Sequence, residues 1–298
     1  MARPGRAGGA IIGPSPTGVT TTPALTDPRR PFAALLAEQA PLDLAEAALA
    51  IARDEYPDLQ AAPYLAMLDA WAARVRDRLP PQPSPADAAG ALRGVLFDEK
   101  GLRGNADDYY DPRNSFLNDV LERRAGIPIS LSAVYMEVGR RAGMRVEGLG
   151  LPGHFIVRVG GTPGILLDPF FGGTELSEEQ CQDRLDRVFG RKARVEAAML
   201  AACDTRAILA RMLRNLKIIY GKRDDHLRAV RVCDRLLELD PAQAAERRDR
   251  GLLYAGLGCY GLAADDLEAY ARQAPRAEDA AEVSLRAAEL RRLAARLN

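Results

Sequence analysis

A repeat in the last third of this 298-residue chain restricts its fold more than any other feature. Residues of the same kind recur at an offset of 34, namely Tyr220 and Tyr254, Ala229 and Ala263, and Pro241 and Pro275. A period of this length is typical of stacked helix pairs, in which small residues let two helices approach and aromatic residues fill the space beside the crossing. We therefore predict a helical repeat region over residues 201–298.

The period matches that of tetratricopeptide repeats, and the second copy fits the pattern better than the first. Gly251 stands at a small-residue position of the second copy, where the first copy has Lys217. Two copies and a final helix from about residue 277 make a short stack, which needs support from the rest of the protein. The groove of such a stack predicts a protein or peptide partner.

The preceding part of the chain predicts helices followed by a small antiparallel sheet. Residues 1–30 are rich in Gly, Pro, Thr and Arg, and we expect them to form a disordered extension. Tyr64, Leu68 and Trp71 recur at helical spacing, so the single tryptophan belongs to the core. A proline at 128 suits the first turn of a helix that Gly143 ends. Residues 31–200 are therefore predicted as one α+β region ahead of the repeats.

His154 and Asp168 are the two chemical groups that this sheet brings together. His154 opens an apolar segment over 154–159, and a glycine-rich turn separates it from the segment 165–168. In such a hairpin His154 lies diagonal to Asp168 on one face. A carboxylate that orients an imidazole can activate a nucleophile. Each residue also has a structural explanation, since a histidine can hydrogen-bond at the start of a strand and Asp-Pro favours a turn.

Ser130 is the hydroxyl nearest in sequence to this pair. It stands near the start of a predicted helix, where the helix dipole favours a developing anion. Serine is also a preferred helix cap for purely structural reasons, and capping is the more common role. Both interpretations of Ser130 stay open at this stage.

Composition excludes several classes of function. Lys and Arg together number 41, as do Asp and Glu, so nothing in the charge indicates nucleic acid or a membrane surface as a partner. The four cysteines are Cys181, Cys203, Cys233 and Cys259. They lack the spacing of a zinc site, and we expect free thiols in a reducing cytoplasm. No apolar run reaches the ~20 residues of a membrane span. We predict a cytoplasmic protein without a metal or cofactor.

A polar, turn-rich loop over residues 101–115 is a candidate binding segment. Its candidate binding residues are Asn105, Asp108, Tyr109 and Tyr110. The oxygen atoms of its Asn and Asp side chains could bind a cation, but the spacing of these residues does not fit an EF-hand. Asx turns and helix caps explain the polar residues better, with the two tyrosines anchoring the loop.

Four segments together resemble the SirB-type family, which joins a transglutaminase-like domain to C-terminal tetratricopeptide repeats. They are residues 104–115 (GNADDYYDPRNS), 124–131 (RAGIPISL), 152–155 (PGHF) and 168–170 (DPF). The resemblance covers about residues 40 to 275. It implies an α+β protein with N-terminal helices, a papain-like or transglutaminase-like core and an α-helical repeat tail, and a regulatory role in bacteria.

The wider transglutaminase-like superfamily uses a Cys-His-Asp triad, and the resemblance maps its histidine onto His154 and its aspartate onto Asp168. Counted from Gly126 and Gly143, the position of the cysteine falls on Pro128. Proline offers no nucleophile, so acyl transfer through cysteine is not supported. We favour a non-catalytic interaction protein, with a hydrolase or amidase acting through Ser130, His154 and Asp168 as the alternative. The oligomeric state stays open.

Overall fold

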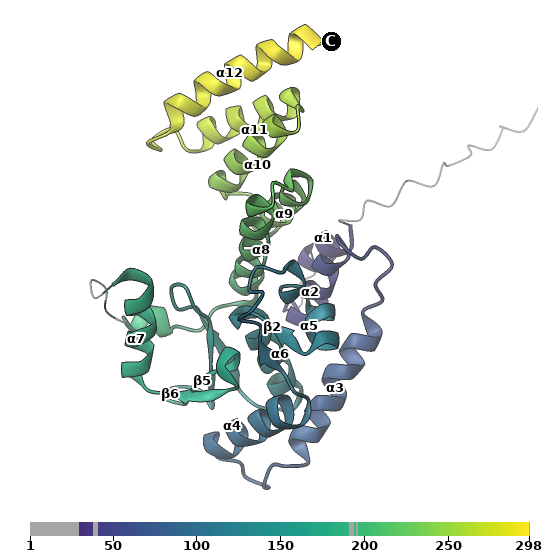
Figure 1. The fold of residues 1–298 in the computed structure, drawn as a ribbon, viewed down its shortest axis with the longest axis vertical. Helices are drawn as coiled ribbons and strands as arrows, with labels where there is room; N and C mark the ends of the chain where they lie inside the picture. Colours follow the sequence, from purple (N-terminus) through teal and green to yellow (C-terminus); the bar gives the residue numbers. More distant parts are fainter. Residues whose placement is uncertain (1–29, 38–40, 191–193, 195, 298) are drawn as a thin grey trace, which may run out of the picture.

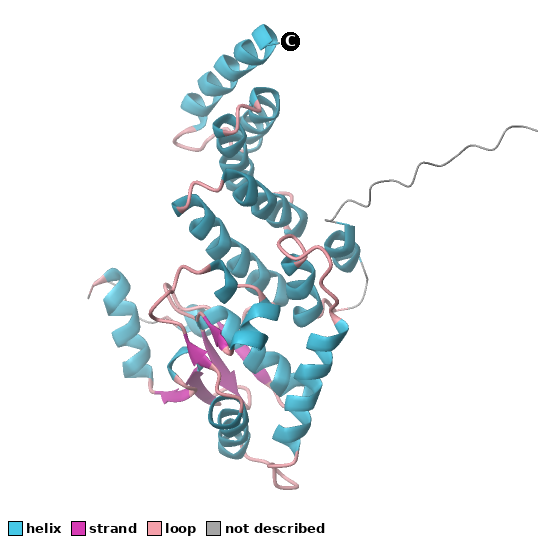
Figure 2. Cartoon of the chain, turned by 45° about the vertical axis from the view of Figure 1, so that its right-hand side comes forward, coloured by secondary structure: helices cyan, strands magenta, loops and turns pink. Residues whose placement is uncertain are grey.

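The computed structural model describes residues 30–37, 41–190, 194 and 196–297. Helices dominate, and a small sheet lies in the lower part of the molecule with the last helices rising above it (Figures 1 and 2). The predicted extension over residues 1–29 lies outside the described residues. Within the described ranges, no helix is long and apolar enough to cross a bilayer.

The N-terminal half is a set of helices around one large core. Its elements are α1 (Arg30–Ala37), α2 (Leu44–Ala52), α3 (Ala62–Arg76), α4 (Pro85–Arg93), the π-helix η1 (Gly94–Glu99), the 3-10 turn η2 (Pro112–Asn114), α5 (Leu117–Arg123) and α6 (Pro128–Arg141). Asp43 caps α2 by accepting a hydrogen bond from the backbone N–H of Glu46 at 3.0 Å. Leu68 and Trp71 of α3 are buried, as their spacing predicts.

The sheet has four antiparallel strands in the order in which they occur along the chain. They are β3 (Val146–Leu149), β4 (Ile156–Val159), β5 (Ile165–Asp168) and β6 (Thr174–Leu176). Val157 pairs with Leu167, so the predicted hairpin register is confirmed. Helices α6 and α4 pack on one face of the sheet, and α7 (Glu178–Phe189) follows β6 in the chain. A separate parallel pair joins β1 (Arg103–Gly104) to β2 (Ala125–Gly126).

One detail of the hairpin differs from the prediction. The strand β4 begins at Ile156, so His154 lies in the loop before it and does not open the strand. Gly153 has a positive φ of 72°, and the backbone N–H of His154 donates to the carbonyl of Leu151 at 3.0 Å. This turn removes His154 from the strand ladder and directs it toward the end of the sheet.

The predicted repeat region consists of five helices. They are α8 (Thr205–Lys222), α9 (His226–Leu239), α10 (Ala244–Gly256), α11 (Tyr260–Gln273) and α12 (Ala280–Leu297), preceded by the 3-10 turn η4 (Ala197–Leu200). They form the upward stack of Figure 1. The proline pair Pro241 and Pro275 follows the ends of α9 and α11, and the alanine pair Ala229 and Ala263 is buried, as predicted.

The two copies of the repeat join their helices differently. A Cβ atom on Gly251 would lie 2.8 Å from a Leu267 methyl group, so glycine allows α10 and α11 to pack closely. Lys217 occupies the same position in the first copy, and its ammonium group forms ion pairs with Glu246 and, at 2.8 Å, with Asp249. The deviation from the repeat pattern at Lys217 therefore supplies an ionic contact between α8 and α10.

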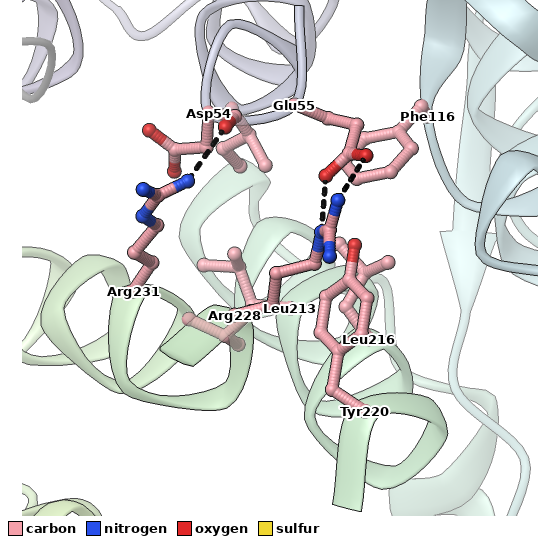
Figure 3. Close-up of a pocket in the computed structure, with 10 residues that line it drawn as sticks. Asp54, Glu55, Phe116, Leu213, Leu216, Tyr220, Arg228 and Arg231 are labelled. Atoms are coloured by element: carbon pink, nitrogen blue, oxygen red, sulfur yellow. Dashed lines mark hydrogen bonds and ion pairs between the residues drawn. The ribbon is translucent and has the colours of Figure 1, made fainter. Parts of the chain in front are cut away.

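The first repeat is docked on the N-terminal helices. Residues of α8 and α9 belong to the large core that also contains α2, α3 and α6, whereas α10–α12 form a second core. At the contact, Arg228 of α9 holds Glu55 by bonds of 2.7 and 2.9 Å beside Tyr220 and Phe116 (Figure 3). The short stack thus receives the support that its length requires.

Candidate functional site

His154 and Asp168 form the predicted pair. Nε2 of His154 lies 2.8 Å from Oδ2 of Asp168, and 13% of the histidine side chain is exposed against 0% of the aspartate. Asp168 ends β5 and is held in place because its other oxygen, Oδ1, accepts from the backbone N–H of Phe170 at 3.1 Å. The carboxylate thereby fixes the orientation of the imidazole at the end of the sheet.

Two neighbouring side chains, those of His154 and Arg184, keep the carboxyl group of Asp168 ionised. Burial alone would raise the pKa of this carboxyl group, but the hydrogen bond with His154 and the guanidinium of Arg184 outweigh it and hold the pKa below its ordinary value of 3.8. Arg184 reaches from α7 and donates to Oδ2 from Nε at 2.9 Å and from Nη2 at 2.7 Å. An ionised Asp168 accepts a hydrogen bond from the Nε2–H group of His154.

A small pocket of about 90 Å³ opens beside the imidazole. It is lined by Tyr109, Pro128, Ile129, Gly153, His154, Phe155, Arg211 and Asn215. Pro128 is buried at the first position of α6, so its ring forms part of the wall that the histidine also lines. Pro128, to which the resemblance assigns the cysteine position, thus shares a pocket with His154, and its side chain carries no nucleophilic atom.

Ser130 lies elsewhere in the same helix and is fully buried. Its hydroxyl donates to the carbonyl of Asn114 at 2.6 Å and accepts from the backbone N–H of Ile127 at 3.1 Å. It is not among the residues that line the pocket. Ser130 therefore caps α6 and ties it to the preceding loop, and this geometry gives no support to its use as a nucleophile.

The polar loop divides its predicted binding residues between two roles. Asn105 donates to the side chain of Asn114 at 3.0 Å and accepts from the backbone of Asp108 at 3.2 Å, so these residues hold the loop in shape. Tyr109 lines the pocket. Tyr110 is half-exposed and packs under the ammonium group of Lys222 at 3.5 Å, which attaches the loop to α8.

Three oxygen-bearing side chains of this loop, those of Asn105, Asp111 and Asn114, are engaged by protein groups. Asp111 is nearly buried and pairs with Arg113 at 2.8 Å and Arg123 at 3.2 Å. Across the part of the chain that the structure describes, no group of three or more His, Cys, Asp or Glu side chains is arranged to hold a metal ion. The loop is thus stabilised by its own ion pairs and turns.

Sequence reasoning missed the aromatic and cationic neighbours of His154. Phe170 and Phe171 lie 6.4 and 6.2 Å from the imidazole centroid, and Phe171 is half-exposed. Arg211 reaches the site from α8 and donates from Nη2 to the carbonyls of Leu151 and His154 at 2.8 and 2.7 Å. The DPFF motif was a signal for the two phenylalanines, but nothing local in sequence connects Arg211 with residues 151–154.

This arrangement defines a class of protein: a transglutaminase-like domain with a histidine–aspartate pair, followed by tetratricopeptide repeats. Residues 62–214 match the model of the transglutaminase-like superfamily, and residues 216–288 match that of the tetratricopeptide repeat. The predicted fold class is confirmed.

The chain is similar over most of its length to bacterial proteins. A UPF0162 protein of Xylella fastidiosa (strain Temecula1) is 42% identical over 238 residues, which cover 78% of this chain and 85% of the relative. A UPF0162 protein of Pseudomonas aeruginosa is 35% identical over 243 residues, covering 81% and 88% respectively. The chain therefore belongs to the UPF0162 proteins, the SirB-like family, within the transglutaminase-like superfamily, as the resemblance predicts.

A more distant similarity is confined to part of the chain. Human F-box only protein 21 is 34% identical over 143 residues, which cover 45% of this chain and 22% of the human protein. No solved structure gives a significant match.

Proposed function

We propose that this protein is a non-catalytic binding protein, in which the transglutaminase-like pocket and the repeats both contact a protein or peptide partner. The observation that carries the proposal is Pro128 on the wall of the pocket beside His154. A triad needs a nucleophile within hydrogen-bond reach of its base, and the proline ring has none. The His154–Asp168 pair then serves as a rigid polar wall.

The repeats supply a second argument for partner binding. Ile218 of α8 and Leu252 of α10 stand one 34-residue repeat apart, and about half of each side chain is exposed (52% and 48%). Equivalent exposed apolar residues on successive repeat helices form a continuous contact surface for a partner segment. We call Ile218 and Leu252 the repeat surface.

Capture of the partner by the full chain tests this function. Proteins retained from a lysate of the native cells are identified by mass spectrometry, and the most enriched one is purified for a direct binding measurement. We expect the double change Ile218→Asp and Leu252→Asp to weaken binding at least tenfold. The control is Leu227→Asp, which alters an exposed leucine of α9 and should leave binding unchanged. Equal binding by the double variant and the control would contradict the proposal.

The rival function is a hydrolase or amidase that uses Ser130, His154 and Asp168. The intact 2.8 Å contact between His154 and Asp168 is the observation in its favour. It requires the Ser130 hydroxyl to leave the carbonyl of Asn114, to which it donates at 2.6 Å. His154→Ala would abolish turnover in that case while leaving capture by the repeat surface intact.

A further inference from the structure

The pocket beside His154 has an excess of positive charge. Arg211 is half-buried, and no acidic side chain forms an ion pair with it within the described ranges. Burial is the main cause that lowers the pKa of Arg211 from its ordinary value. The first turn of α6 adds the positive end of a helix dipole to the same pocket. The negative charge of Asp168 is already shared by His154 and Arg184.

Arg211 is held in one position, so the directions of its remaining N–H donors are fixed. Nη2 donates to the carbonyls of Leu151 and His154, and the guanidinium lies 5.3 Å from the centroid of the Phe155 ring. Gly150 leaves room for it, since a Cβ there would lie 3.2 Å from Nη1. Nε and Nη1 have no hydrogen-bond acceptor among the described residues. Nη1 can donate one charge-assisted hydrogen bond to an oxygen of a carboxylate, and the second oxygen of that carboxylate is left for another donor.

Asn215 completes the polar side of the pocket. It follows Arg211 by one helical turn of α8, lines the same pocket, and its amide makes no hydrogen bond within the described part of the chain. Ile129 and Phe155 provide apolar wall on the other side. The pocket, with a volume of about 90 Å³, has room for a small terminal group such as a carboxylate.

We propose that this pocket binds a carboxylate group of a peptide or protein partner, with Arg211 and Asn215 as the recognising residues. The inference rests on the proposed binding function, because it assumes that the pocket holds its ligand without turning it over. Two sources share this chemistry, namely the C-terminal carboxylate of a chain and the side chain of an acidic residue.

Titration of the full chain by NMR with small probes tests the proposal. N-acetylglycine carries a terminal carboxylate, N-acetylglutamic acid α-amide carries a side-chain carboxylate, and N-acetylglycinamide carries none. We expect at least one carboxylate probe to bind at least tenfold more tightly than the amide. Tighter binding of N-acetylglycine assigns the pocket to a chain terminus, and tighter binding of the glutamate probe assigns it to an acidic side chain. Equal binding of all three, or no binding of any, would overturn the proposal.

Variants identify the recognising residue. Arg211→Gln should weaken binding of the carboxylate probe at least tenfold, and Asn215→Leu should weaken its binding a few-fold. The matched control is Arg206→Gln, because Arg206 also belongs to α8 and also donates to two backbone carbonyls, those of Leu36 and Leu239, but is exposed and outside the pocket. If Arg211→Gln does not fold, Asn215→Leu and the amide comparison in the unchanged protein decide. Unchanged affinity in a folded Arg211→Gln variant would refute the assignment.

Failure of this inference is distinguishable from failure of the proposed function. Loss of the carboxylate site would leave partner capture by Ile218 and Leu252 intact. Failure of the proposed function would instead appear as hydrolysis of N-acetylglycine ethyl ester or N-acetylglycinamide that His154→Ala abolishes.

Discussion

Pro128 determines what the imidazole beside it can do. His154 is oriented by Asp168 in the manner of a general base, yet the wall of its pocket at the start of α6 is a pyrrolidine ring. Proline at the first helical position also removes a backbone N–H from the helix N-terminus, where a donor would otherwise stabilise an oxyanion. The residue therefore removes a nucleophile and a hydrogen-bond donor together.

Pro128→Cys tests whether this position faces His154. A cysteine at a helix N-terminus beside an imidazole is expected to have a lowered pKa and to react quickly with iodoacetamide. Alkylation of the new thiol near neutral pH, followed by site-resolved mass spectrometry, should be at least tenfold faster than in a second variant that also carries His154→Ala. The native Cys181 and Cys233 interfere little, because burial raises the pKa of both thiols, that of Cys233 to about 12. Equal alkylation rates with and without His154 would show that the side chain at position 128 does not contact the imidazole.

Asp168 makes stability depend on pH in a defined direction. Because the pKa of Asp168 is lowered on folding, its ionisation stabilises the folded state above its ordinary pKa of 3.8, and this contribution is lost as the pH falls through the lower folded value. Asp168→Asn should cost about 3 kcal/mol near neutral pH, since it leaves Arg184 without its buried partner. Urea unfolding should show this difference from the unchanged protein shrinking below pH 3.8.

Asp183→Asn is the control for that measurement, because Asp183 is an exposed aspartate of the same helix, α7. It should change the free energy of unfolding by less than about 0.5 kcal/mol at either pH. A difference for Asp168→Asn that is independent of pH would contradict the assigned electrostatic role.

The repeat helices contact one another in two ways, by close packing at a glycine and by ion pairs. Close approach of α10 and α11 requires the missing side chain of Gly251 beside Leu267, whereas Lys217 connects α8 to α10 with ion pairs. In α10 itself, Arg250 pairs with Asp234 of α9 at 2.6 Å and with Asp266 of α11 at 2.7 Å. Successive helices are thus connected by charge as well as by apolar contact.

Gly251→Ala should loosen the second core. The added methyl group meets the Leu267 side chain at 2.8 Å, so overpacking is expected to cost about 1–3 kcal/mol of unfolding free energy. Gly261→Ala is the matched control, because Gly261 lies in α11 with open space around its Cβ position and should gain about 0.5–1 kcal/mol of helix stability. Thermal unfolding followed by circular dichroism separates the two. Stabilisation by Gly251→Ala would show that α10 and α11 do not pack this closely.

At the scale of elements, local patterns predicted more than long-range ones. The pairing of His154 with Asp168 followed from a hairpin whose short turn sets the register. Arg184 and Arg211 were not predicted, because they are 16 and 57 residues from the groups they bind and belong to helices whose placement depends on tertiary packing. The π-helix over Gly94–Glu99 likewise leaves no mark in the hydrophobic periodicity.

The whole molecule is a core with a helical stack fastened to it. Arg235 of α9 is fully buried and binds the carboxylate of Asp54 with two bonds, from Nε at 2.8 Å and from Nη2 at 2.6 Å. It also pairs with Glu238 at 2.9 Å and lies 5.4 Å from the centroid of the Phe32 ring. The repeats therefore begin at an anchored position, which sets where Arg211 of α8 meets the pocket.

Arg235→Ala tests this anchoring. Removing one partner of a buried ion pair should cost about 3–5 kcal/mol, measured by urea unfolding of the full chain. The control is Arg231→Ala on the same helix, since Arg231 is exposed and donates to the backbone carbonyl of Asp54 at 3.3 Å, and it should cost less than about 1 kcal/mol. Similar costs for the two variants would mean that the buried pair does not fasten the repeats to the core.

The most direct test of a non-catalytic pocket is a comparison of turnover by the unchanged protein and by His154→Ala. Each full-length protein is incubated with a defined mixture of peptides, peptide amides and esters, and the products are followed by mass spectrometry over several hours. The account predicts the same product profile, at the level of the buffer alone, for both proteins. Hydrolysis or acyl transfer that is present in the unchanged protein and absent in His154→Ala would contradict it and identify an enzyme.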